Sequence, residues 1–152
     1  MSAEAGHVDA MSRLGHRLSG RGDYAGAEHW YRKAAASGDL MAMNSLGVMQ
    51  QQRGDFAKAE ARFRKAAEAG LDYAMNNLGN LLLDRPEHQH EAAHWYRKAA
   101  EAGHRDAMNN LGVVLSWSGE LDDAERWFRE SGLPYALDNL RQLQIRREGS
   151  RD

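Results

Sequence analysis

One short motif in this sequence has the residue types and spacing of a metal site, HEAAH at residues 90–94. On a helix, H-E-x-x-H spacing places two imidazoles one turn apart, where they can hold zinc, and supplies a glutamate as general base. His90, Glu91 and His94 could therefore serve a zinc-dependent hydrolase. His88 lies two residues upstream, so adventitious binding of zinc or nickel by the three histidines is a second possibility.

Composition limits the other chemistry that is available. The chain has 152 residues, no cysteine, 20 Lys and Arg, and 22 Asp and Glu, for a formal net charge of −2. Without cysteine there is no thiol nucleophile, thiolate metal site or disulfide. The balanced charge gives no general reason to expect nucleic acid or anionic lipid as a partner. No apolar run is long enough to span a membrane and the first residues lack a signal-peptide pattern, so we expect a cytoplasmic protein.

An internal repeat organises the whole sequence. The dipeptide Leu-Gly begins at residues 14, 46, 78 and 111, so successive copies are 32, 32 and 33 residues apart. The same register carries an alanine and a methionine before each pair, and a later alanine followed after four residues by an aromatic ring. The aromatic positions are Tyr31, Phe63, Tyr96 and Phe128. A fixed period of this length is typical of stacked supersecondary units.

Each copy has the periodicity of two amphipathic helices. Met11, Leu14 and Leu18 are spaced i, i+3, i+7, and the second half of each copy has the same kind of apolar stripe. Glycines that suit helix ends occur at Gly6, Gly22, Gly38, Gly54, Gly70, Gly103 and Gly119. By this register Gly6 would end a helix that begins before the first residue. The glycine of each Leu-Gly pair lies inside a helix at a cost of about 1 kcal/mol relative to alanine, so we expect it to permit close approach of the paired helix.

These residues resemble the tetratricopeptide superfamily, and more closely its Sel-one-like repeats (SLR). The segments AHWYRKAAEAGH at 93–104 and DAMNNLGVVL at 106–115 carry the resemblance, which extends over nearly the whole chain. It implies an α-solenoid that binds other proteins, commonly through the concave surface lined by the first helix of each repeat. It does not imply an enzyme.

The repeat register favours a surface position for the HEAAH motif. The place of His90 is taken by alanine or aspartate in the other copies, and that of His94 by histidine, alanine or arginine. Positions that accept such different side chains face solvent or a helix flank, where two histidines one turn apart need no ligand. A catalytic zinc also needs a third protein ligand, and the extended histidine pattern of metzincins is absent beyond His94. We therefore predict no enzyme, no cofactor and no dedicated metal.

The predicted fold is all-α, a right-handed α-solenoid that forms a single repeat domain over residues 1–152. The four helix-turn-helix repeats are expected at about 8–38, 39–70, 71–103 and 104–132. A C-terminal capping helix is expected at 133–148, because residues 134–143 align with the first helix at 72–81 and no partner helix follows. Its polar outer residues suit the end of a solenoid.

The first helices supply the candidate binding residues. If they line a concave face, the side chains around each Leu-Gly pair project into it, and asparagine dominates these positions. An amide offers both a donor and an acceptor, so it can pair with the backbone of an extended peptide. The predicted partner-binding residues are Asn44, Tyr73, Asn76, Asn77, Asn80, Asp106, Asn109 and Asn110. The equivalent positions of the first two repeats include Asp9, Ser12, Arg13, His16, Met41 and Ser45. Alternatively, the asparagines pair with neighbouring side chains or face water.

The function predicted from these patterns is a non-catalytic protein-protein interaction module or scaffold. Its partner would be a protein or an extended peptide, with no nucleic acid and no membrane, and the chain would be a monomer or weakly self-associating. The alternative is a structural or self-associating array, or a fragment of a larger repeat protein that docks through its open N-terminal edge. A zinc-dependent hydrolase that uses His90, Glu91 and His94 is the more distant alternative.

Overall fold

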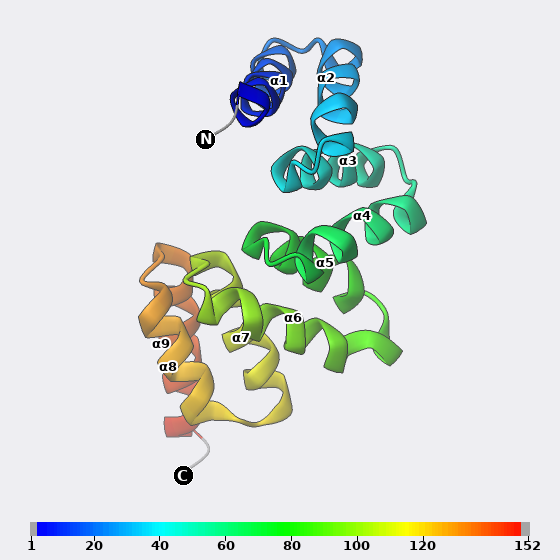
Figure 1. Ribbon diagram of the computed structural model, residues 1–152. Coiled ribbons are helices and arrows are strands. Elements are labelled where there is room, and N and C mark those ends of the chain that lie inside the picture. Colours follow the sequence, from blue (N-terminus) through cyan, green and yellow to red (C-terminus); the bar gives the residue numbers. More distant parts are fainter. Residues whose placement is uncertain (1–2, 150–152) are drawn as a thin grey trace. The chain divides into compact units, whose positions relative to one another are not determined.

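The computed structural model describes residues 3–149, with side chains from residue 6 onward. Over this range the chain forms nine α-helices and one short 3-10 helix, without a β-strand (Figure 1). They are α1 (Ala3–Gly20), α2 (Tyr24–Ala36), α3 (Leu40–Gln52), α4 (Phe56–Glu68), α5 (Asp72–Leu83), η1 (Pro86–His88), α6 (Gln89–Glu101), α7 (Arg105–Ser118), α8 (Leu121–Ser131) and α9 (Pro134–Gly149). The predicted α-helical repeat fold is confirmed. No helix within residues 3–149 is long and apolar enough to cross a membrane.

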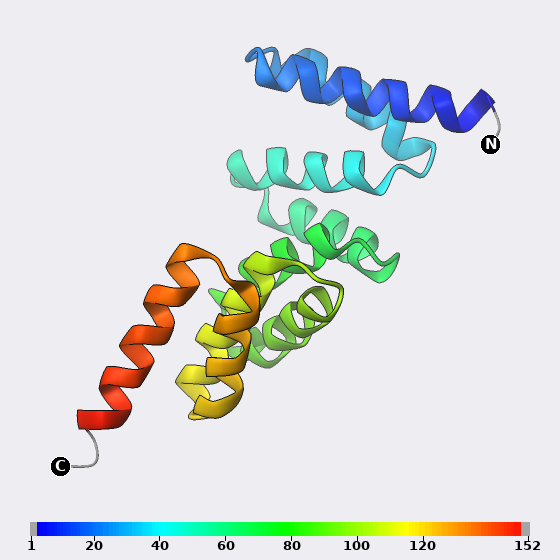
Figure 2. The same ribbon diagram turned by 90° about the vertical axis from the view of Figure 1, so that its left-hand side faces the viewer.

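The chain divides into two compact units, one up to Ala74 and the other from Met75. In the first unit, α1 packs against α2, α2 against α3, and α3 against α4 (Figure 2). In the second unit, which contains most of α5, helix α7 packs against α6 and α8, and α9 packs against α8 and α7. The division of the chain into four repeats with the boundaries given above, and the capping role of 133–148, stay predictions.

Glycines and aspartates determine where the helices begin and end. All the glycines predicted to end helices, except Gly6, have positive φ angles between 81° and 98°. At two helix starts the preceding aspartate accepts a backbone hydrogen bond, from Gly26 N–H to Asp23 at 2.9 Å and from Ala42 N–H to Asp39 at 2.8 Å. Such N-caps satisfy amides that have no partner inside the helix.

The expected helix end at Gly6 is wrong, because α1 runs without a break from Ala3 to Gly20. Continuing α1 through Gly6 instead gives its backbone regular helical hydrogen bonds.

The repeated Leu-Gly pair and the repeated aromatic residue pack directly against each other. The ring of Phe63 on α4 lies so close to Gly47 on α3 that a Cβ atom there would come within 2.6 Å of it. The equivalent distances for the other three glycines are 2.6–2.7 Å, to the rings of Tyr31, Tyr96 and Phe128. The predicted close approach of paired helices is therefore confirmed, since any side chain at these positions would displace an aromatic ring.

The core of each repeat is built from small and large side chains in alternation. The alanine that comes four residues before each ring is completely buried in all four second helices, at Ala27, Ala59, Ala92 and Ala124. On α9, a narrow stripe of Ala136, Leu140 and Leu143 is buried, and the opposite side of this helix is exposed. Alanine allows the helices to approach closely, and the rings fill the remaining space at the density typical of protein interiors.

Candidate functional site

The HEAAH motif lies on the surface of α6. His90 and His94 are both exposed, and His88 Nδ1 lies 3.4 Å from a carboxylate oxygen of Glu91. Within the described part of the chain, no group of three or more His, Asp and Glu side chains is arranged to hold a metal ion. The structure thus gives no support to a hydrolase at His90, Glu91 and His94.

The predicted asparagines of the second unit form a network that joins successive first helices. Asn110 Nδ2 on α7 donates to Asn76 Oδ1 on α5 at 3.0 Å and to Asn80 Oδ1 at 3.2 Å. The next step repeats the first of these bonds, because Asn139 Nδ2 on α9 donates to Asn109 Oδ1 on α7 at 2.9 Å. The amides therefore bond across the helices at equivalent positions of consecutive repeats.

A second-helix tyrosine extends this network. The hydroxyl of Tyr96 on α6 donates to Asn80 Oδ1 at 2.8 Å, and its ring is packed on Gly79. Burial raises the pKa of Tyr96 well above its ordinary value, with a smaller contribution from the negative charge of Asp84. The hydroxyl thus stays protonated and remains a donor to Asn80. The sequence pattern of asparagines alone does not indicate this partner, although the shared register of ring and glycine brings the two helices together.

Burial separates the predicted binding residues into groups. Asn44, Asn76 and Asn109 are buried, Asn77 and Asn110 are half-buried, and Tyr73, Asn80 and Asp106 are exposed. Asp106 accepts a hydrogen bond from the hydroxyl of Tyr135 on α9. Asn76 and Asn109 accept bonds from the following first helix, whereas the exposed members are accessible to a partner. A role of these eight residues in partner binding stays a prediction.

The first unit has a hollow on the equivalent side of its helices. The hollow has a volume of about 450 Å³ and is lined by the six first-helix side chains at equivalent positions, Asp9, Ser12, Arg13, His16, Met41 and Ser45, together with Arg17, Tyr31 and Asp39. Arg13 Nε lies 2.8 Å from a carboxylate oxygen of Asp9, and both side chains are largely exposed. Tyr31 is not among the predicted binding residues, because its repeat position on the second helix indicates packing between helices.

With this geometry established, comparison with known families identifies the class of protein. The tetratricopeptide repeat model matches residues 8–37, 40–69 and 104–131, and the Sel1 repeat model matches residues 72–104. Because the first model covers more than half of the chain, the protein belongs to the tetratricopeptide repeat family, close to the Sel1-like repeats. Members of these families are typically non-catalytic and mediate protein-protein interaction.

Solved structures agree with this assignment. The chain is similar to c5321, a protective antigen of uropathogenic Escherichia coli with an SLR fold, at 29% identity and a TM-score of 0.83 over 95% of this chain and 35% of that one. It is also similar to a Sel1 repeat protein from Oxalobacter formigenes, at 26% identity and a TM-score of 0.75 over 88% and 62% of the two chains. For pilF of Pseudomonas aeruginosa, identity is 21% and the TM-score 0.79 over 97% and 72%, which shows a shared fold. The chain thus spans about a third of the first of these structures and less than two thirds of the second. A search of curated proteins found no match.

Proposed function

We propose that this protein is a non-catalytic interaction module that binds an extended segment of a partner protein. The binding surface is the face formed by α5, α7 and α9 in the second unit, called here the first-helix face. The family assignment supports protein-protein interaction in general, and the asparagine network supports this face in particular. The cytoplasmic location and a role as a scaffold stay predictions.

The observation that carries the proposal is the way in which Asn80 is held. Its side-chain oxygen accepts from both Tyr96 and Asn110, whereas its amide nitrogen has no partner among residues 6–149. An exposed amide that is fixed on one side presents two N–H donors in a defined direction. A partner's backbone carbonyls can accept from these donors, and little side-chain entropy is lost because the amide is already ordered.

Exposed apolar side chains near the starts of first helices add non-polar contacts to this polar row. In the second unit Tyr135 on α9 is 45% exposed, and its hydroxyl donates to Asp106 on α7, the preceding first helix. In the first unit Met41, also 45% exposed, occupies the equivalent place and borders the hollow. Aromatic and methionine side chains are enriched at protein interfaces, because they bury much area for little lost flexibility.

A structural or self-associating role is the second candidate, and one observation favours it. Helices α7 and α9 expose further large apolar side chains, with Trp117 63% and Ile145 61% exposed. Light scattering across a range of protein concentrations distinguishes this role from the first. A mass that rises with concentration supports self-association, and a constant monomer mass supports a face open to other partners.

Selection from a random peptide library, followed by NMR mapping, tests the proposed function. We expect selected peptides to perturb the side-chain amide signals of Asn80 and Asn110 and the backbone of α5 and α7. A second-helix residue such as Arg126, exposed on α8, should show no change. Peptides that perturb α8 and leave the asparagine amides unaffected would overturn the proposal.

A further inference from the structure

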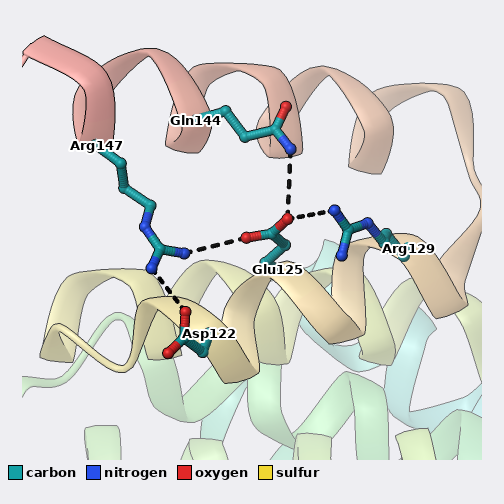
Figure 3. A network of polar contacts seen from close by, with 5 residues as sticks. All are labelled: Asp122, Glu125, Arg129, Gln144 and Arg147. Carbon is teal, nitrogen blue, oxygen red and sulfur yellow. Dashed lines mark hydrogen bonds and ion pairs between the residues drawn. The ribbon is translucent and has the colours of Figure 1, made fainter.

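In each unit, one glutamate on a second helix forms ion pairs with two arginines. Glu28 on α2 accepts from Arg32, one turn later in the same helix, and from Arg53 at the end of α3 at 2.6 Å. Glu125 on α8 occupies the equivalent position and pairs with Arg129 on its own helix and with Arg147 on α9 at 3.1 Å (Figure 3). We call this arrangement the carboxylate clamp. The two carboxylate side chains are only 14% and 17% exposed.

Helices α6 and α7, the second helix of one repeat and the first helix of the next, lack this clamp. In the repeat register Ala93 stands at the place of Glu28, and Ser118 stands at the place of Arg53. A hollow of about 370 Å³ lies there instead. Its lining includes Ala93 and Arg97 from α6, and Leu115, Trp117 and Ser118 from α7. The absence of a carboxylate and of its second arginine therefore coincides with open space.

Arg97 is the part of the clamp that remains. At the equivalent position Arg32, Arg64 and Arg129 each pair with a glutamate four residues earlier. Arg97 has an alanine there, and no ion pair or hydrogen bond of its side chain is found within residues 6–149. The acidic residue in the lining, Glu120, accepts a hydrogen bond from Ser118 Oγ at 2.9 Å.

An apolar wall forms part of the lining next to this cation. Leu83, Val114 and Leu115 contribute aliphatic surface, and Trp117 presents a largely exposed indole. On the α6 side, His90 adds an imidazole ring and Gln89 adds a side-chain amide. A guanidinium beside an aromatic and aliphatic wall is suited to a carboxylate that stands next to an apolar group.

We propose that this hollow is a docking site for an acidic side chain of a partner protein, with a neighbouring apolar side chain packed on Trp117 and Leu115. The partner's carboxylate takes the place that Glu28 and Glu125 occupy in the clamps and binds Arg97. The site lies between α6 and α7 and contains no asparagine. It is therefore a second contact region, in addition to the proposed first-helix face.

A pair of blocked peptides tests the proposal directly. One peptide has a glutamate between two leucines, and the other has glutamine in its place. Each is titrated into the full chain while NMR follows the indole N–H of Trp117. We expect the glutamate peptide to shift this signal, and we expect its affinity to fall at least about tenfold for the glutamine peptide or for Arg97→Gln, because a charge-assisted hydrogen bond is lost.

A matched pair of variants separates the hollow from a general effect of charge. Ala93→Glu restores the missing carboxylate beside Arg97, so we expect it to weaken peptide binding at least about tenfold. Arg32→Gln removes the same charge from an occupied clamp in the first unit and should leave the peptide affinity unchanged. Circular dichroism checks that each variant keeps its helical content.

Four results would overturn the proposal. The first is equal affinity for the glutamate and glutamine peptides, and the second is unchanged affinity in both Ala93→Glu and Arg97→Gln. The third is a Trp117 shift that depends on protein concentration without any peptide, which would assign the hollow to a second copy of the chain. Binding that is lost only in Asn80 and Asn110 variants would place the peptide on the first-helix face instead.

Discussion

The side chain of Asn139 on α9 donates to that of Asn109 on α7 at 2.9 Å, as Asn110 donates to Asn76 one repeat earlier at 3.0 Å. In each bond the acceptor is a buried asparagine and the donor is a half-buried one in the following first helix. The asparagines of the second unit (Asn76, Asn80, Asn109, Asn110 and Asn139) therefore also join neighbouring helices by hydrogen bonds. Substitutions of these asparagines affect stability as well as binding.

Truncation of Asn139 tests this structural role. Asn139→Ala leaves the buried oxygen of Asn109 without its donor, so we expect a loss of about 1–3 kcal/mol in the free energy of unfolding. Gln142→Ala is the control, because Gln142 is an exposed side chain on the same helix. Urea unfolding measures both. Equal stability of the two variants would show that the bond between Asn139 and Asn109 contributes nothing.

The glycines of the Leu-Gly pairs allow a sharper test of packing. Alanine at position 79 would place its Cβ 2.6 Å from the ring of Tyr96, so we expect Gly79→Ala to cost about 1–3 kcal/mol. At Gly6, within α1, a Cβ would point into open space with no atom within 4 Å, so Gly6→Ala should stabilise the helix by up to about 1 kcal/mol. Thermal unfolding measures the change in stability for both variants, and we expect the two changes to have opposite signs. A neutral Gly79→Ala would contradict the close ring contact.

Acid should weaken the carboxylate clamp of the first unit. Hydrogen bonding from Arg53, together with the charges of Arg32 and Arg53, holds the pKa of Glu28 below its ordinary value of 4.5. The stability contributed by this group is complete above pH 4.5 and is lost as the pH falls through the lowered folded-state pKa. The stability difference between the wild type and Glu28→Gln should therefore shrink between neutral pH and pH values below 4.5.

The control for this pH effect is an exposed ion pair. Asp138 pairs with Arg141 on α9 at 3.2 Å, and their side chains are 70% and 75% exposed. Asp138→Asn should change stability by less than about 1 kcal/mol at any of these pH values. A difference between wild type and Glu28→Gln that stays constant with pH would contradict the assignment of Glu28 as an ionised clamp residue.

Metal removal tests the interpretation of the HEAAH motif. Because His90 and His94 are exposed and no third ligand is near among the residues that the structure describes, treatment with a chelator should leave the helical circular dichroism and the melting temperature unchanged. Atomic absorption of the purified protein provides the matching measurement. Stoichiometric zinc whose removal unfolds the chain would show that the surface interpretation of these histidines is wrong.

The sequence predicts the helical framework well, for an identifiable reason. The Leu-Gly pair and the aromatic ring recur at a fixed spacing, and each depends on the other physically, because the ring needs the space that the glycine leaves. Regular repetition thus predicts both helices and their contact. Gly6 is the exception, because α1 continues through this glycine where the local pattern predicts a helix end.

The polar contacts are harder to predict from the sequence than the helices. The direction of an asparagine amide depends on distant neighbours, such as Asn139 for Asn109, 30 residues away, and periodicity alone does not choose between a neighbouring helix, water and a partner. The carboxylate clamp could have been predicted from the sequence. Glu28 and Arg53 are separated by 25 residues, and in α6 and α7 Ala93 and Ser118 replace them at the same spacing. A comparison of repeats position by position identifies such paired replacements.

The central claim is that the first-helix face of the second unit binds a partner, and calorimetry with a library-selected peptide tests it most directly. The wild type is compared with Asn80→Ala, which removes the outward amide, and with Arg126→Ala on the exposed side of α8. The proposed function predicts an affinity at least about tenfold weaker for Asn80→Ala and unchanged for Arg126→Ala. Unchanged affinity for Asn80→Ala together with weaker binding by Arg126→Ala would contradict it.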